Sequence, residues 1–166
     1  MIRNFLLLAL CCLASSGANA GEWGLGLGGH YIDDGEGVGI TSAAVSFDYQ
    51  INDNFAVAGQ LAGGGSDDVG IVEIDLDTAL SLSVRFGAKM GNTFLYASAG
   101  AYNANLSASG CYWGYCATET ADGGGGMAGV GAKFSLGTNW ALDLSYDHTF
   151  GDFEGNSGSV SIRYVF

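Results

Sequence analysis

The residues best suited to acid–base chemistry lie near the C-terminal end of the chain. His148 follows Asp147 directly, and Glu154 and Ser157 come a few residues later. A histidine works as a general base when a nucleophile lies within hydrogen-bonding reach and an acid orients its ring. The surrounding residues alternate between apolar and polar types, so His148 shares a face with Phe150 while Asp147 points to the opposite face. We therefore expect no enzymatic activity and no cofactor.

Two cysteines, Cys111 and Cys116, bracket a short aromatic segment that contains Tyr112, Trp113 and Tyr115. A zinc site needs four ligands, and no histidine lies near this pair. An exported chain can form disulfides, and we predict that this pair staples a loop. Aromatic side chains supply much contact energy at low entropic cost, so one hypothesis is a recognition tip. The alternative is that the rings enter a lipid leaflet or pack against neighbouring loops.

The charged residues are few and strongly acidic in balance. The chain of 166 residues has 17 Asp and Glu against 5 Lys and Arg, a formal net charge of -12. This surplus excludes a nucleic-acid binder, because phosphate contacts need clustered basic residues. Ten acidic residues fall in four segments that contain no Lys or Arg: Asp33, Asp34, Glu36, Asp67, Asp68, Glu73, Glu119, Asp122, Asp152 and Glu154.

Such an acidic rim has three interpretations. It could gather divalent cations such as Ca²⁺ or Mg²⁺, which prefer oxygen ligands and would bridge to phosphates. It could attract a cationic surface or peptide. It could also be a soluble, self-repelling rim without a partner. No stretch has the ligand spacing of an EF-hand loop, so we predict no specific metal site.

The first 20 residues have the pattern of a secretory signal peptide. Arg3 provides a basic start, residues 5–13 form an apolar stretch, and Ala18-Asn19-Ala20 is a small-x-small cleavage site. Nine apolar residues are too few to span a bilayer. We predict a cleaved leader at 1–20 and one domain at 21–166.

After residue 20 the sequence alternates apolar with small or polar residues, and this period of two indicates strands with two different faces. The expected strands cover 22–31, 39–50, 54–63, 74–88, 93–103, 126–136, 140–150 and 159–166. Tight turns rich in Asn, Asp and Gly are expected at 51–54, 90–92 and 137–139. Longer connections are expected at 32–38, 64–73, 104–125 and 151–158. This alternation of short and long connections is typical of an up-and-down meander.

The two faces of the expected strands differ in residue type, and this difference indicates whether the outside of the barrel meets water or lipid. Bulky apolar residues share one face, and small or charged residues share the other. Strand 93–103 is ambiguous, and we place Phe94, Tyr96 and Tyr102 outside. The small face could not fill the core of a soluble barrel to normal density. With the bulky face on lipid, the small face fits a narrow lumen, and closure leaves no unpaired edge. Aromatic residues near strand ends would form the interfacial girdles: Trp23, Tyr31, Tyr49, Phe55, Trp140, Phe150, Tyr164 and Phe166.

We therefore predict an all-β protein, an eight-stranded antiparallel up-and-down transmembrane β-barrel. Its lumen face would carry Arg85, Lys133 and Arg163, and burying an unpaired charge costs several kcal/mol. The available acidic partners are Asp48, Asp75, Asp77, Asp143 and Asp147. We predict that these eight residues form a lumen ion network that plugs the barrel. The alternative is a gated path for small ions.

The leader, the alternating strands, turns such as YQINDNF and the terminal SIRYVF resemble the small outer-membrane β-barrels of Gram-negative bacteria, which include the OmpA transmembrane domain, OmpX and the opacity proteins. The resemblance covers the whole mature chain and rests on pattern. It implies a location in the cell outer membrane, contact with outer-membrane lipid and lipopolysaccharide, a monomer, periplasmic termini and long loops outside the cell. It also implies an assembly signal, read by the barrel-assembly machinery, at the matching residues Ile162, Tyr164 and Phe166.

This resemblance favours a non-enzymatic protein with a structural or surface-interaction role, in adhesion or envelope integrity. One alternative is a narrow, porin-like passive channel for ions or solutes. A second is a lipid A-modifying enzyme, because some small outer-membrane barrels act on lipid A. The deacylase type carries a His-x-Ser arrangement, whereas Phe150 stands at the second position after His148.

Overall fold

The computed structural model describes residues 21–33, 38–70, 72–113 and 115–166, so the predicted leader lies outside the described part. The described residues form nine strands: β1 (Glu22–Asp33), β2 (Gly39–Asn52), β3 (Phe55–Gly63), β4 (Gly65–Val69), β5 (Val72–Met90), β6 (Thr93–Tyr112), β7 (Tyr115–Ser135), β8 (Trp140–Gly151) and β9 (Gly155–Val165). No helix among these residues is long and apolar enough to cross a bilayer.

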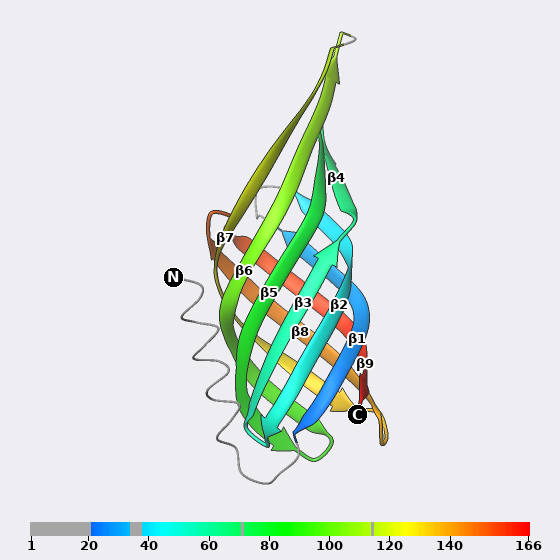
Figure 1. Cartoon of the computed structure of the whole chain (residues 1–166), viewed down its shortest axis with the longest axis vertical. Coiled ribbons are helices and arrows are strands. Elements are labelled where there is room, and N and C mark those ends of the chain that lie inside the picture. The colour runs from blue at the N-terminus through cyan, green and yellow to red at the C-terminus, as the bar shows by residue number, and fades with distance from the viewer. Residues whose placement is uncertain (1–20, 34–37, 71, 114) are drawn as a thin grey trace.

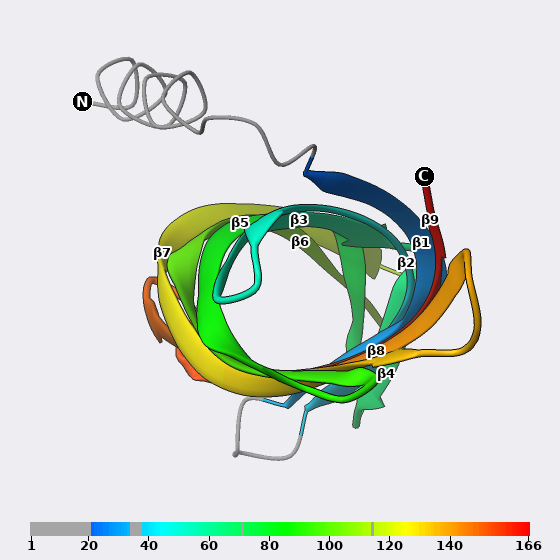
Figure 2. The same cartoon turned by 90° about the horizontal axis from the view of Figure 1, so that it is seen from below.

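The strands close into a single antiparallel barrel, seen end-on in Figure 2. β1 pairs with β9, and β3 pairs with β5, so the sheet returns on itself. β3 and β4 together occupy one strand position of the barrel, because both pair with β5 in one continuous register. Ala62 lies opposite Ala79, and Gly65 lies opposite Leu76. Gly64, with φ of 75°, interrupts them. Counted in this way, the barrel is eight-stranded, as predicted.

The two ends of the barrel differ. The tight turns lie at one end, together with the C-terminus, and we call this the short-turn end (Figure 1). At the opposite end, the hairpin end, β6 and β7 continue well beyond the other strands. Their pairing runs without a break from Thr93 opposite Phe134 to Tyr112 opposite Tyr115.

The expected long loop at 104–125 is therefore wrong, because most of it is a regular two-stranded ribbon. Its residues are mainly Ala, Ser, Thr and Gly, and most of them are partly or fully exposed. A ribbon with solvent on both faces needs no apolar alternation. The period of two that marks a half-buried strand is consequently missing from this segment.

Bulky apolar side chains cover the outside of the barrel, while small and polar ones fill the inside. Leu25, Leu27 and Phe86 are exposed, whereas Ser46, Asp48 and Arg163 are buried. This inverted distribution is expected where the outer surface meets lipid. At the short-turn end, Trp23 packs on Tyr49 with ring centroids 4.5 Å apart, and Trp140 packs on Tyr164 at 5.2 Å.

Three predicted side-chain orientations in β6 are wrong. Phe94 and Tyr96, expected on the lipid face, point into the lumen with only 6% and 4% of their surface exposed. The lumen has room for them because small residues stand opposite. A Cβ atom on Gly131, the partner of Tyr96 in β7, would lie 2.4 Å from the tyrosine ring. Tyr102, also expected outside, is half-buried and lines the lumen at the hairpin end.

In β5, the alternation of inward-facing and outward-facing side chains reverses at one point. The pairing of β5 with β6 shifts between Leu76 and Thr78, which marks a bulge. An extra residue moves the following side chains to the opposite face. Leu76 is therefore buried inside, and Asp77 is exposed on the outer face, contrary to the prediction for both.

Candidate functional site

Five charged side chains from five strands meet in the lumen near the short-turn end. They are Asp48 of β2, Arg85 of β5, Lys133 of β7, Asp143 of β8 and Arg163 of β9. Each sits on the small-residue face of its strand, so the period of two that builds the barrel also aims these groups at one another. All five are buried.

Arg163 lies at the centre of this lumen ion network. Its Nη1 donates to Asp48 Oδ1 at 2.8 Å, and its Nη2 forms a salt bridge with Asp143 Oδ2 at 2.5 Å. Lys133 Nζ lies 2.8 Å from Asp48 Oδ2, and Arg85 Nη1 lies 2.7 Å from Asp143 Oδ2. Two carboxylates are thus shared among three cations in one continuous chain of ion pairs, three of which are also charge-assisted hydrogen bonds.

Tyr96 is a further member that the sequence reasoning missed. Its hydroxyl donates to Asp143 Oδ1 at 2.7 Å, and the Arg85 guanidinium carbon lies 4.4 Å from its ring centroid. A cation at this distance over a ring is attracted by its electron-rich face. The glycine opposite, Gly131, is the signal that could have placed the ring inside, but it is informative only once the strand register is known.

Three predicted members stay outside the network. Asp147 is buried, with its Oδ1 accepting a hydrogen bond from Ser98 at 2.7 Å, but it forms no salt bridge within the described residues. Asp75 and Asp77 lie beyond the bulge of β5 on its outer face. Asp77 accepts a hydrogen bond from Ser107 there.

The lumen ion network separates two cavities inside the barrel. One, of about 340 Å³, lies at the hairpin end, and the other, of about 320 Å³, lies at the short-turn end.

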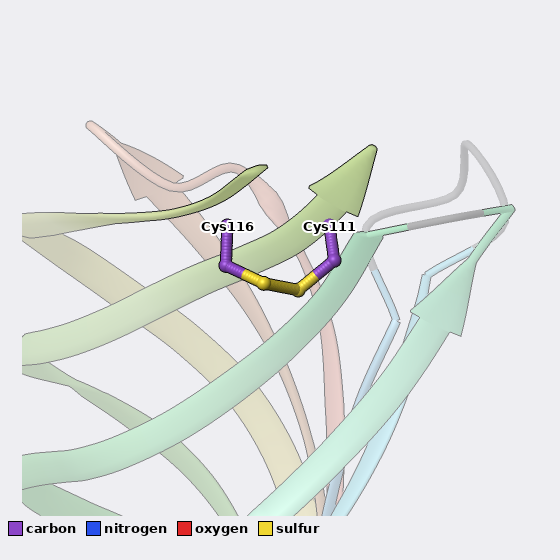
Figure 3. Close-up of a disulfide and its surroundings, with 2 residues drawn as sticks. All are labelled: Cys111 and Cys116. Atoms are coloured by element: carbon purple, nitrogen blue, oxygen red, sulfur yellow. A yellow bond between two sulfur atoms is a disulfide. The ribbon is translucent and has the colours of Figure 1, made fainter. Parts of the chain in front are cut away.

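The second candidate site is the tip of the β6–β7 hairpin. Cys111 and Cys116 are disulfide-bonded, as predicted, and face each other across the two strands (Figure 3). Trp113 and Tyr115 are 84% and 85% exposed, and Trp113 adopts a positive φ of 51° in the turn. The side chain of Tyr112 lies outside the described part of the structure.

The acidic residues of the hairpin end are partly engaged in holding the connections together. Asp67 Oδ2 accepts a hydrogen bond from the backbone of Gly39 at 2.7 Å, and Asp152 Oδ2 accepts one from Gly124 at 3.0 Å. Asp34 and Glu36 fall outside the described residues. In the part of the chain that is described, no cluster of three or more His, Cys, Asp or Glu is arranged to hold a metal ion.

The candidate acid–base residues His148 and Ser157 are separated in the structure. His148 points outward, with its Nδ1 3.1 Å from Asn156 Oδ1 and its Nε2 3.9 Å from Glu154 Oε1. Ser157 is buried, and its hydroxyl donates to the backbone carbonyl of Asp147. The imidazole and this hydroxyl therefore lie on different faces of the wall.

The residues of the expected assembly signal share the outer face of the last strand. Ile162, Tyr164 and Phe166 are all exposed, and the Tyr164 and Phe166 ring centroids lie 5.0 Å apart. The Phe166 N–H donates to the Trp23 carbonyl at 2.8 Å, which ties the C-terminus to β1.

Comparison with known proteins gives a consistent result. Residues 5–166 match the family described as outer membrane protein beta-barrel domain. No curated protein matches the chain in sequence. The solved structure of Ail, the attachment invasion locus protein of Yersinia pestis, is 18% identical, covers 89% of this chain and 100% of Ail, and gives a TM-score of 0.63. The outer membrane protein OprG of Pseudomonas aeruginosa is 14% identical, covers 91% of this chain and 98% of OprG, and gives a TM-score of 0.69. At these identities the likeness extends to the fold alone.

Proposed function

Since the chain belongs to the family of outer-membrane β-barrel proteins and lies in the outer membrane of Gram-negative cells, we propose that it is a non-enzymatic surface-interaction protein that binds through the tip of its β6–β7 hairpin. In this proposal the hairpin end faces the cell exterior and the lumen is closed. The protein contributes to adhesion or envelope integrity through this tip.

The exposed aromatic tip is the observation that carries the proposal. Trp113 and Tyr115 are almost fully exposed at the far end of a long ribbon. Large aromatic side chains left in water mark contact sites, because their burial against a partner is strongly favourable. The Cys111–Cys116 disulfide fixes the ribbon beside them, which reduces the entropy lost on binding.

The ribbon between barrel and tip supports a contact in water rather than insertion into lipid. Thr118, Glu119, Thr120 and Asp122 of β7 are all exposed. Carboxylates and hydroxyls are costly in the hydrocarbon layer. A ribbon with this surface stands away from the membrane, so the tip would meet a partner outside it.

The charge of the outer connections restricts the partner. One structure of Ail contains the heparin analogue sucrose octasulfate, a polyanion. The connections at the hairpin end of this chain contain carboxylates and no Lys or Arg, so polyanion binding is not part of the proposal. An apolar or cationic partner surface fits better, and a layer of divalent cations would be needed to bridge the rim to lipopolysaccharide phosphates.

The lumen ion network favours a closed barrel over the channel alternative. Its central side chain, Arg163, is only 2% exposed, and its partners hold it from two directions. The separation of His148 from Ser157 supports the expectation of no lipid A chemistry. Mass spectrometry of lipid A from cells with and without the gene tests that expectation, and acyl loss that disappears in a His148→Ala variant would contradict it.

We further propose that Ile162, Tyr164 and Phe166 form the signal read by the barrel-assembly machinery. Their shared outer face at the end of β9 supports this assignment.

Binding by the purified protein in nanodiscs tests the role of the tip. Whole cells, and isolated lipopolysaccharide in the presence of Mg²⁺, serve as the probes. We expect a variant with Tyr112, Trp113 and Tyr115 changed to Ser to bind at least about tenfold more weakly, since aromatic hot spots each contribute ~2 kcal/mol or more. A Thr118→Ala, Thr120→Ala variant alters the same ribbon without removing aromatics and should bind like the parent. Unchanged binding by the triple variant would rule out the tip.

A further inference from the structure

The lumen at the hairpin end contains a cavity that the ion network does not use. Its volume is about 340 Å³, which lies within the ~300–1,000 Å³ range of small-molecule sites. We call it the outer cavity. Its walls are largely aliphatic and come from β1, β2, β5, β6 and the connection before β2: Ile32, Val38, Ile40, Ile74, Leu76 and Leu106.

A wall of large aliphatic side chains is unexpected in this position, because most of the lumen face carries small or polar residues. Ile40, Leu76 and Ala104 are buried together there, and Ile74 and Leu106 pack against them. The bulge in β5 places Leu76 inside, so a specific backbone irregularity builds this surface. Apolar walls around an enclosed space favour an occupant that displaces water from them.

The outer cavity also has a fixed roof. Phe153, in the connection between β8 and β9, lines it beside Tyr102. The Phe153 N–H donates to the Tyr102 hydroxyl at 3.0 Å, and that hydroxyl donates to the Phe153 carbonyl. Since both backbone groups of Phe153 are held, the roof is formed in advance, which lowers the cost of binding.

The floor of the outer cavity is polar and acidic. Asp147 is 7% exposed and has Ser98 as its hydrogen-bond donor. Arg85 and Arg163 lie beneath it, but their Nη groups donate to Asp143 and Asp48 instead. A buried carboxylate without an ion-pair partner is costly.

A second polar group at the floor, on His30, lacks a hydrogen-bond partner among the described residues. The Nδ1 atom of His30 is buried and has no hydrogen-bond partner in the described residues. Buried polar atoms are nearly always bonded, so each exception requires an explanation. Carboxylates of Asp147, Asp152 and Glu154 line the cavity, and no Lys or Arg does so among the described residues.

We propose that the outer cavity binds a small amphipathic amine. Its ammonium group would donate to the Asp147 carboxylate, with His30 Nδ1 as a second acceptor. Its apolar body would lie against Ile40 and Leu76 beneath Phe153. The acidic lining excludes anions of the same shape. This site is separate from the hairpin tip and holds whether or not the tip binds a partner.

A matched series of ligands tests the proposal on the protein in nanodiscs. 2-Phenylethylamine, 2-phenylethanol and 3-phenylpropanoate share one ring and differ in the charge of the head group. Titrations are followed by the NMR shifts of backbone amides around Asp147 and Phe153. We expect saturable binding of the amine, about tenfold weaker binding of the alcohol because a charge-assisted hydrogen bond is lost, and no binding of the carboxylate.

Three variants distinguish binding at this site from general partition into lipid. Asp147→Asn should remove the preference for the amine over the alcohol. Ala62→Phe, which fills the cavity from β3, should abolish binding of both, whereas Ala97→Phe on the exposed face of β6 should not. Equal, non-saturating shifts for all three ligands, or an amine preference that persists in Asp147→Asn, would overturn the proposal. The Asp147→Asn variant tests the proposal even if the Ala62→Phe variant does not fold.

Discussion

Arg163 is the cation of the lumen ion network that pairs with both of its carboxylates. It lies on β9, bonds Asp48 of β2 and Asp143 of β8, and so acts across the seam where β1 meets β9. Removing Arg163 would break two buried ion pairs and leave each carboxylate with a single cation, Lys133 for Asp48 and Arg85 for Asp143, and breaking a buried pair is strongly destabilising.

We expect Arg163→Ala to lower the free energy of unfolding by about 3–5 kcal/mol, the usual cost of breaking a buried pair. Urea titration of the protein refolded in lipid vesicles measures this value. Lys89→Ala removes an exposed cation near the short-turn end and serves as the control, with a change below about 0.5 kcal/mol. Equal effects of the two substitutions would show that the buried pairs do not stabilise the barrel.

Sequence reasoning identified the charges at this site but not all of their positions. Alternation placed Arg85, Lys133 and Arg163 on one face, and the structure brings them together with Asp48 and Asp143. The position of Tyr96 could not be read from β6 itself, because both faces of that strand carry small or aromatic residues. Its inward direction depends on Gly131 in a neighbouring strand, which contributes space only in the final register.

At the scale of the strands, adjacent glycines in β1 have different roles. A Cβ atom at Gly28 would lie 1.9 Å from the carbonyl oxygen of Val160 and 2.6 Å from the Cα of Ser161. At Gly29 the nearest atom would be 4.0 Å away, on Ser42. Of these two positions, β9 closely approaches Gly28, on the lumen face, and not Gly29.

This difference predicts that adding a methyl group lowers the stability of the barrel at one glycine and not at the other. Gly28→Ala forces the β1–β9 seam apart and should cost about 1–3 kcal/mol of stability, as overpacked sites do. Gly29→Ala should be neutral or slightly stabilising, because alanine reduces the freedom of the unfolded chain. Refolding into vesicles, followed as the gel-mobility shift between folded and heat-unfolded protein, compares the two. A stable Gly28→Ala variant would mean that the strands are less closely spaced there.

The strands themselves were largely predictable, whereas the hairpin was not. The Asn, Asp and Gly turns at the short-turn end occur where the sequence predicts them. The ribbon of residues 104–125 lacks an apolar face because neither side is buried against a core. Its regularity comes from backbone pairing with its own partner strand, and backbone pairing leaves no periodic signature in residue type.

At the scale of the molecule, the three tryptophans mark the two ends of the barrel axis. Trp23 and Trp140 lie on the outer face near the short-turn end, and Trp113 lies at the hairpin tip. In single-tryptophan variants, brominated lipid should quench Trp23 and Trp140, while aqueous iodide should quench Trp113. Strong quenching of Trp113 by brominated lipid would show that the tip enters the leaflet, and the surface-contact proposal would then fail.

The overall architecture follows from two features of the sequence, a period of two and an excess of small residues on the charged face. These features suffice to choose a lipid-facing barrel over a soluble one. They do not reveal the outer cavity, which depends on the bulge at Leu76 in β5. A bulge inserts one residue without a distinctive sequence, so the reversal of faces appears only in the paired sheet.

The central claim is that the ion network closes the lumen and the protein acts through its surface. Conductance of the purified protein in a planar lipid bilayer tests this most directly. We predict no steady current through the parent protein and discrete current steps through Arg85→Ala, which opens the network at Asp143. Stable ohmic steps from the parent, or variant currents no larger than those of the parent, would contradict it.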